Sequence, residues 1–441
     1  MAGKITRSAP LAGSEPGGKV NMQRAAKAYT WDMYPKTTAR HPTRRSESLF
    51  TTMRTLLLPL LASSLAFADT PKLPGIGEVM EKMIAQNEVA GAVTVVANKN
   101  GLLHLEANGL ADIEKQKPMS VDAMAWIASM TKPITGAAIM MLQDEGKLNI
   151  VDPVSKYLPE FAALKTPSGK PANITITQVL THTSGLGEAK GPKADEAHTL
   201  ADLVPIWLAT PMQFEPGTQW KYCQSGINTA ARIVEVISGM TFDEFLQKRL
   251  FEPLGMTNTT FYPTDAQWAQ VATGYAKNKD SGKLEAVPPR GDFGKRGRPP
   301  QGNGGLYSCA KDYTRFCRML LNGGTLDGKR ILSPEAVKTL SSVHTGDLPC
   351  GFFQRAEFGN HGANYGWGIG ACVLKEPHAG LAEMLSPGAF GHGGAWGTQA
   401  WIDPKKDVIY VLIVQRANFP NSDASPVREA FQKAAAKALA K

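Results

Sequence analysis

The order of periodic segments along the chain constrains the fold most, because strand patterns occur near both ends and helical patterns fill the middle. Apolar runs at 92–97 and 102–105 flank a predicted turn at Asn100-Gly101, which indicates a β-hairpin. Near the other end, strand patterns cover 366–374, 397–402 and 408–414. We therefore expect one sheet built from both ends of the chain.

Helical spacing of apolar residues predicts most of the other elements. Helices are expected at 76–84, at 227–237 ending at Gly239, at 242–250 before Pro253, and at 426–440. The expected fold class is α/β: an antiparallel sheet flanked by helices, plus an inserted, mainly helical region. The α/β part is assigned to 69–128 and 291–441, and the helical insertion to 129–290.

The first 68 residues form two predicted segments that precede the domain. Arg54, a leucine run and the small residues of Ala66-Phe67-Ala68 are typical of a secretory signal at 53–68, which predicts a mature chain of 69–441 in the periplasm or outside the cell. The run is shorter than the ~20 residues needed to cross a bilayer, so no membrane span is expected to remain. Residues 1–52 are expected to be disordered or a mis-assigned extension, and their arginines leave an organellar presequence as the alternative.

Charge and metal-binding patterns exclude several functions. The formal net charge is +9, but residues 1–68 carry ten Lys/Arg against three Asp/Glu, and the remainder is nearly neutral. No nucleic-acid partner is therefore expected. The 5 Cys lack paired spacing and are expected to be small buried residues, and the 8 His lack H-x-x-x-H, so no metal is predicted. No pattern specifies an oligomeric state.

The first chemical motif is Ser129-Met130-Thr131-Lys132, which opens an apolar helical pattern ending at Gly146. Residues three apart lie on one helical face, so the Lys132 ammonium can reach the Ser129 hydroxyl. A serine becomes a good nucleophile when a neighbouring group lowers its pKa or takes its proton. Backbone N–H groups at a helix start can also stabilise an oxyanion.

Further stretches accompany this motif in a fixed order. They are 148–159, 180–186, 214–224, 304–308 and 391–397. With Ser129 and Lys132 they resemble the serine β-lactamase and penicillin-recognising superfamily, in particular class C β-lactamases and family VIII carboxylesterases. The resemblance covers nearly all of 76–415. The active site is expected between the α/β part and the helical insertion, because clefts between structural regions commonly hold ligands.

This resemblance implies acyl transfer without a cofactor. Ser129 matches the acylated nucleophile and Lys132 its partner. Tyr222 matches the tyrosine that takes the serine proton and returns it to the leaving group, which requires cations such as Lys132 to favour the phenolate. The backbone N–H groups of Ser129 and Ala395 would form the oxyanion hole.

Four residues are the predicted substrate-binding residues: Gln224 in the second motif and His392, Gly393 and Gly394 in the third. The glycines would let substrate lie against bare backbone. His392 stands where many relatives have lysine, so it offers a substrate carboxylate less attraction at neutral pH and would begin to charge near pH 6. Gln224 replaces asparagine and is one methylene longer. Both differences favour an ester without a free carboxylate.

A Ser-His-Asp esterase is the rival fold, and His182 suggests such a triad. No G-x-S-x-G occurs in the chain, so the nucleophile elbow of that fold is absent. His182 is instead expected to be a hydrogen-bonded scaffold residue.

We therefore predict a serine hydrolase acting through an acyl-enzyme on Ser129, first of all a carboxylesterase on short-acyl esters. The alternatives are a class C-like β-lactamase or a D-amino-acid peptidase or amidase, and, second, a penicillin-binding or scaffold protein without turnover. The expected partner is a small-molecule ester, amide or β-lactam.

Overall fold

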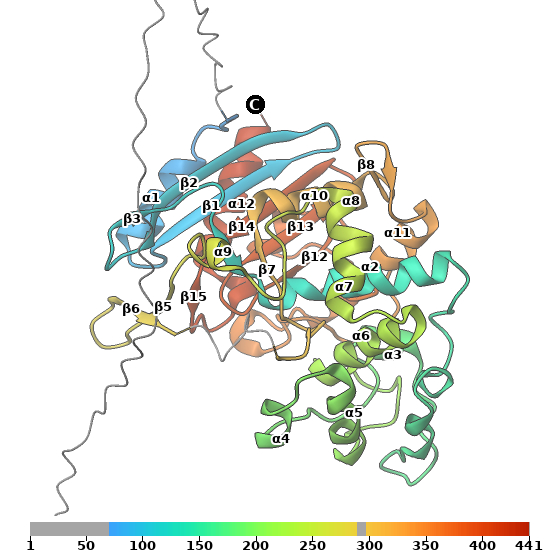
Figure 1. Ribbon diagram of the computed structural model, residues 1–441. Coiled ribbons are helices and arrows are strands. Elements are labelled where there is room, and N and C mark those ends of the chain that lie inside the picture. Colours follow the sequence, from blue (N-terminus) through green and yellow to red (C-terminus); the bar gives the residue numbers. More distant parts are fainter. Residues whose placement is uncertain (1–69, 289–296, 441) are drawn as a thin grey trace, which may run out of the picture. The chain divides into compact units, whose positions relative to one another are not determined.

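The computed structural model describes residues 70–288 and 297–440 (Figure 1). The predicted extension at 1–52 and the signal peptide at 53–68 lie outside the described residues. Within the described part, no helix has both the length and the apolar character that crossing a bilayer requires.

One large sheet of eight strands forms the centre, in the order β10-β11-β12-β13-β14-β1-β2-β3. The strands are β1 (Gly91–Ala97), β2 (Leu102–Asp112), β3 (Lys117–Pro118), β10 (Tyr365–Trp367), β11 (Cys372–Leu374), β12 (Phe390–Gly393), β13 (Gln399–Asp403) and β14 (Val408–Ile413). All neighbours are antiparallel, and β1 pairs with β14 from Val93↔Ile413 to Ala97↔Ile409. The prediction of a sheet built from both chain ends is confirmed, as is the fold class.

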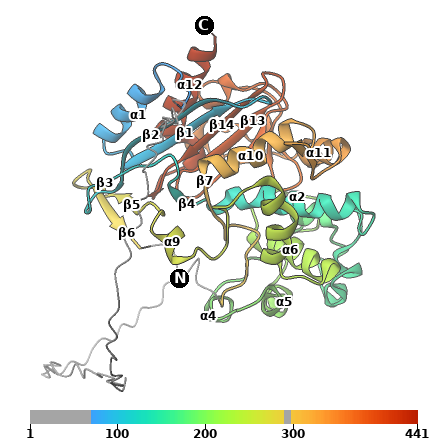
Figure 2. The same cartoon turned by 45° about the horizontal axis from the view of Figure 1, so that its top comes forward.

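Helices cover both faces of this sheet (Figure 2). Alternate strand residues point to opposite faces, so Val93 and Val95 of β1 pack in the same cluster as α10 (Ala310–Leu321). Ala92 and Val96 belong instead to the cluster with α1 (Ile76–Ala85) and α12 (Pro426–Leu439). Every residue of β1 is therefore buried.

The β1–β2 hairpin forms where the sequence predicts it. Asn98 closes its turn, because the Asn98 side-chain oxygen accepts hydrogen bonds from the backbone N–H groups of Asn100 at 2.9 Å and Gly101 at 3.1 Å. The short polar side chain thus satisfies the backbone of the turn.

The predicted strand at 366–374 is wrong in one respect, because this stretch is a hairpin of β10 and β11 rather than one strand. Its turn contains Gly370, whose φ of +79° is a left-handed conformation that favours glycine. The turn packs on α2 (Thr131–Asp144): a Cβ on Gly370 would lie 2.5 Å from the Lys132 carbonyl oxygen, and one on Gly136 would overlap the Ile369 carbonyl. These backbone contacts fix α2 against the hairpin.

In Figure 1, α3, α4, α5 and α6 are grouped at the end of the molecule away from β1 and β2, and Figure 2 shows α4, α5 and α6 in the same place. The helices that follow α2 in the chain are α3 (Ile176–Leu180), α4 (Pro192–Asp195), α5 (Leu200–Ala209), α6 (Gln224–Ser238), α7 (Phe242–Leu246), α8 (Glu252–Leu254) and α9 (Asp265–Trp268), and α11 (Pro334–Ser341) comes after α10. As predicted, α6 ends at Gly239, which has a φ of 68°. Pro253 does not end its helix, because a π-helical turn at Gln247–Phe251 leads into α8 and places the proline in the first turn.

In the described part of the chain, the remaining short strands form three smaller sheets. The segment assigned to the helical insertion also contains β5 (Gly274–Lys277) and β6 (Leu284–Val287), which pair with β15 (Arg416–Ala417). Likewise β4 (Met124–Trp126) pairs with β7 (Tyr307–Cys309), and β8 (Thr325–Leu326) with β9 (Lys329–Arg330). Short 3₁₀ turns lie at Ala128–Met130, Val154–Lys156, Pro159–Ala163, Ala356–Phe358, Gly362–Asn364, Leu381–Met384 and Ser422–Ala424. All five cysteines are buried and free, as expected.

Candidate active site

Ser129 lies in the 3₁₀ turn Ala128–Met130, directly before α2. Ala128 has a φ of 46°, so a residue with a side chain holds a left-handed conformation beside the serine. The turn is held from both sides: the Ile127 N–H donates to the Leu306 carbonyl at 3.0 Å, and the Thr131 hydroxyl donates to the Ala128 carbonyl at 2.7 Å. Ser129 is half-buried and therefore partly accessible.

Lys132 is completely buried and contacts Ser129 as the spacing predicts. Its Nζ donates to Ser129 Oγ at 3.0 Å and to the Asn303 carbonyl oxygen at 2.6 Å. Burial lowers the pKa of Lys132 well below 10.5, and the nearby Glu188 carboxylate opposes this only in part. A neutral Lys132 amine has a lone pair that can accept the Ser129 proton.

Tyr222 lies between Lys132 and His392. The Lys132 Nζ sits over its ring, 4.6 Å from the centroid, and the hydroxyl oxygen is 3.4 Å from His392 Nε2. Burial raises the pKa of Tyr222 well above 10, and the neighbouring Ser129 side chain opposes this only in part. The expectation that cations such as Lys132 favour the phenolate is therefore wrong: burial also disfavours the charged form of Lys132, and desolvation keeps Tyr222 a neutral phenol.

His392 is completely buried at the end of β12. Its Nδ1 is 2.6 Å from the Gly393 carbonyl oxygen, which can only accept, so Nδ1 carries the proton and Nε2 accepts from Tyr222. Burial lowers the pKa of His392 to about 3, and the charge of Lys132 acts in the same direction. The imidazole is thus uncharged at neutral pH, but the expectation that it begins to charge near pH 6 is wrong.

Gly393 and Gly394 approach neighbouring groups too closely for any side chain. A Cβ on Gly393 would lie 2.5 Å from Asp423 Oδ1, and one on Gly394 would lie 2.6 Å from the Ile127 carbonyl oxygen. Gly394 is therefore packed on the residue two positions before Ser129. This contact brings the segment of Ala395 alongside the turn of Ser129, the two residues predicted to form the oxyanion hole.

Gln224, the first residue of α6, is tied to another side chain. Its Oε1 accepts a hydrogen bond from Asn303 Nδ2 at 3.0 Å, and the Asn303 carbonyl in turn accepts from Lys132. Gln224 therefore helps to hold Lys132, in addition to the substrate-binding role that the sequence predicts.

The sequence analysis missed Glu188 and Asn303. The Glu188 carboxylate accepts from the backbone N–H groups of Gln224 at 2.7 Å and Ser225 at 3.2 Å, so it satisfies the start of α6. The Asn303 N–H donates to Asn228 Oδ1 at 3.1 Å. The sequence offers one indication of Asn303, which stands directly before the 304–308 motif.

His182 is buried and has a φ of 62°. Its Nδ1 lies 3.1 Å from both the backbone nitrogen and the carbonyl oxygen of Cys223, and its carbonyl accepts from the Lys221 N–H at 2.9 Å. Its ring centroid is 4.4 Å from that of Tyr222. His182 therefore holds the 221–223 segment in place, which is the scaffold role expected of it. Over the described ranges, no three His, Cys, Asp or Glu side chains gather as a metal site would require.

The chain is similar to a known protein family, to two known proteins and to a solved structure. The family model described as Beta-lactamase matches residues 76–435. Protein Rv1367c of Mycobacterium tuberculosis is 34% identical over 367 residues, covering 76% of this chain and 88% of that protein. Esterase EstB of Burkholderia gladioli is 27% identical over 373 residues, covering 77% and 89%. The solved structure of EstCE1, described as a hydrolase with promiscuous acyltransferase activity, shares the fold with a TM-score of 0.69 at 23% identity, covering 82% of this chain and 97% of that one.

Proposed function

The chain belongs to the beta-lactamase family of serine hydrolases, and from that premise we propose that it is a carboxylesterase that forms an acyl-enzyme on Ser129. The observation that carries the esterase proposal is the buried, uncharged His392 in the third motif. The relative named esterase EstB supports the same substrate class.

The reaction begins at the pair of Ser129 and Lys132. Ser129 Oγ attacks the ester carbonyl carbon while the neutral Lys132 amine takes the hydroxyl proton. The backbone N–H groups of Ser129 and Ala395 stabilise the oxyanion that forms. This assignment follows from the 3.0 Å contact between Lys132 Nζ and Ser129 Oγ and from the lowered pKa of Lys132.

Tyr222 completes the first half-reaction. When the bond to the alcohol oxygen breaks, the Tyr222 hydroxyl gives its proton to the leaving alkoxide, and the Lys132 ammonium restores the proton of Tyr222. The raised pKa of Tyr222 keeps this proton available. In the second half-reaction Lys132 takes a proton from water, and the water oxygen attacks the acyl carbon. The bond between Ser129 Oγ and the acyl carbon then breaks, Tyr222 returns a proton to Ser129, the Lys132 ammonium reprotonates Tyr222, and the carboxylic acid leaves.

His392 decides between esters and carboxylate-bearing β-lactams. A fixed ammonium about 4 Å from a carboxylate contributes on the order of 1 to 4 kcal/mol between water-like and surface-like dielectric. A neutral imidazole forgoes most of this attraction, whereas a neutral ester loses nothing. The proposal therefore ranks esters above β-lactams and above D-amino-acid peptides with a free carboxylate.

A paired assay tests the proposal. We expect p-nitrophenyl butyrate to be hydrolysed with a kcat/KM at least tenfold above that of a chromogenic cephalosporin. The Ser129→Ala variant should be inactive on both, and a fluorophosphonate adduct should map to Ser129 by mass spectrometry. Preference for the cephalosporin would favour the β-lactamase alternative. A stable penicillin adduct without turnover of either substrate would favour a penicillin-binding role.

A further inference from the structure

We propose that the alcohol part of the substrate binds in the cavity beside Tyr222 and is an aromatic or other flat apolar group, with Phe352 setting this preference. The cavity has a volume of about 500 Å³ and is lined in part by Trp220, Tyr222, Phe352 and Phe358. This volume lies within the range of about 300–1,000 Å³ typical of small-molecule pockets. The inference rests on the proposed esterase function.

The position of Tyr222 assigns this cavity to the alcohol rather than the acyl part. A group that protonates the leaving oxygen must come within about 2.6–3.2 Å of it. Tyr222 lies beside Ser129, because the Lys132 Nζ that contacts Ser129 Oγ at 3.0 Å also sits 4.6 Å from the centroid of the Tyr222 ring, and Tyr222 forms part of the cavity wall. An alcohol oxygen held at the Tyr222 hydroxyl therefore directs the rest of the alcohol into the cavity.

The aromatic walls favour a flat apolar group. The Phe352 ring packs edge-on against Tyr222 at 5.2 Å and against His392 at 5.6 Å, measured between centroids. The Trp220 ring lies 6.2 Å from Tyr222. Such walls can pack face-on or edge-on against an aromatic ring of the substrate, and these contacts stabilise binding beyond the burial of apolar area alone. The charged lining residues are Lys221 and Arg355, so a cationic alcohol is disfavoured.

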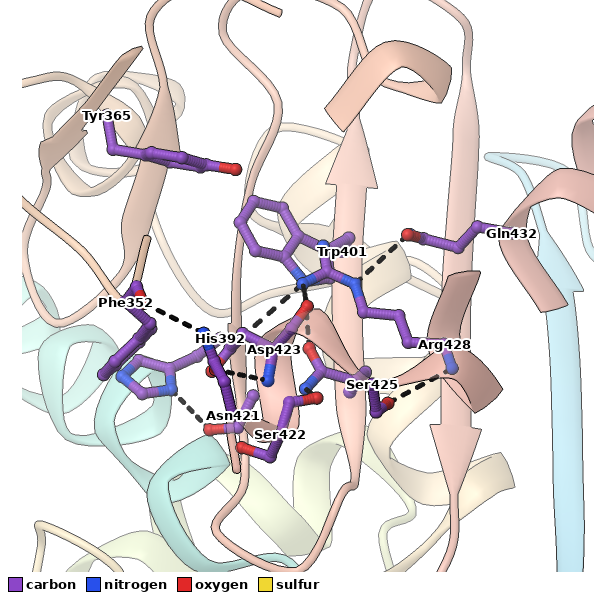
Figure 3. A network of polar contacts seen from close by, with 12 residues as sticks. Phe352, Tyr365, His392, Trp401, Asn421, Ser422, Asp423, Ser425, Arg428 and Gln432 are labelled. Carbon is purple, nitrogen blue, oxygen red and sulfur yellow. Dashed lines mark hydrogen bonds and ion pairs between the residues drawn. The ribbon is translucent and has the colours of Figure 1, made fainter. Parts of the chain in front are cut away.

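Phe352 is held in this position by Asn421, which also lines the cavity. Asn421 Nδ2 donates to the Phe352 carbonyl at 2.9 Å, and Asn421 Oδ1 accepts from the Asp423 N–H at 3.0 Å (Figure 3). The Asp423 carbonyl accepts at 2.8 Å from Arg428, a buried residue of α12. The wall is therefore anchored to the buried core, and Asn421 is a positioning residue for specificity.

The test compares butyrate esters of benzyl alcohol and cyclohexylmethanol, which share the acyl group but differ in flatness. We expect the native protein to prefer the benzyl ester. Phe352→Leu keeps an apolar side chain but removes the aromatic face. It should raise KM for the benzyl ester about tenfold, whereas KM for the cyclohexylmethyl ester should change less than twofold. An equal loss on both esters, or no preference in the native protein, would overturn the inference while leaving the esterase proposal intact.

Asn421→Asp tests the anchoring. It removes the donor to Phe352 and keeps the acceptor for Asp423, so the benzyl preference should fall about three- to tenfold, mainly through KM. Asn418→Asp is the matched control: the same change three residues earlier, outside the cavity lining, should leave the preference unchanged. An equal effect of both variants would show that Asn421 does not position Phe352.

A binding measurement keeps the inference testable if neither ester is hydrolysed, a result that would count against the esterase proposal. In the Ser129→Ala protein, saturation-transfer NMR should detect benzyl alcohol binding more tightly than cyclohexylmethanol. Phe352→Leu in the same background should remove this difference. Equal binding of the two alcohols would refute the cavity assignment whatever the reaction.

Discussion

Burial of His392 makes a quantitative prediction about stability in acid. The folded-state pKa is about 3, whereas an unfolded histidine titrates near 6.5. Below pH 6.5 the unfolded chain therefore binds a proton that the folded chain does not. The stabilising contribution is complete above pH 6.5 and is lost as the pH falls from 6.5 towards 3. In this range each pH unit lowers the free energy of unfolding by about 1.4 kcal/mol. His392 alone therefore lowers the free energy of unfolding by on the order of 5 kcal/mol.

His392 does not act alone in this respect. His104 is also buried, and desolvation lowers its pKa to about 4. Burial lowers the pKa of His182 well below 6.5 as well. Domains of this kind are stable by only about 5–15 kcal/mol, so we expect unfolding to become easy near pH 4.

The measurement is urea unfolding of the native protein and His392→Gln at pH 6.0 and 4.5. The native protein should lose about 2 kcal/mol more of its free energy of unfolding over this interval than the variant loses. His344→Gln, at an exposed histidine, is the matched control and should behave like the native protein. Equal losses in the native protein and His392→Gln would refute the argument from burial. Because His392 stays neutral, the ratio of ester to cephalosporin turnover should not change between pH 8 and 6.

Three further predictions concern the reaction and its location. Tyr222→Phe should lower kcat for p-nitrophenyl butyrate by roughly 10²- to 10⁴-fold while the circular dichroism spectrum stays native. A much smaller loss of kcat would mean that another group protonates the leaving alcohol. The reaction needs the neutral amine of Lys132, so kcat/KM should rise as the pH passes the lowered pKa of Lys132 and should level off below pH 10.5, the ordinary lysine pKa. A rise of kcat/KM only above pH 10 would contradict this. Protein from the exported fraction of the native host should begin near Asp69, and a cytoplasmic chain beginning at Met1 would argue against processing.

Much of the fold follows from local pattern. The apolar run at 92–97 predicts a strand, and it is continuous because both faces of β1 are buried; the turn residues after it predict the hairpin. Gly239 marks the end of α6 because its left-handed conformation suits glycine. The contact of Ser129 with Lys132 is equally local, since three residues along a helix bring two side chains to one face.

The features that the sequence analysis missed depend on residues far apart in the chain. The turn inside 366–374 is set by its packing on Gly136, which no local pattern reports. Asn303 meets Gln224 and Lys132 only through the tertiary fold. The protonation states of Tyr222 and His392 follow from desolvation in the folded protein, whereas the sequence shows only their neighbours along the chain.

The close packing of α2 on the β10–β11 hairpin has a consequence for protein engineering. Gly136 and Gly370 leave no room for a side chain, so libraries that vary these positions should return almost only glycine. The 354–358 segment is exposed at 355–357, contains no such glycine, and contributes to the wall of the cavity. Substrate range can therefore be redesigned, and in nature can diverge, by exchanging a short surface segment while the turn that carries Ser129 and the helix that carries Lys132 stay untouched.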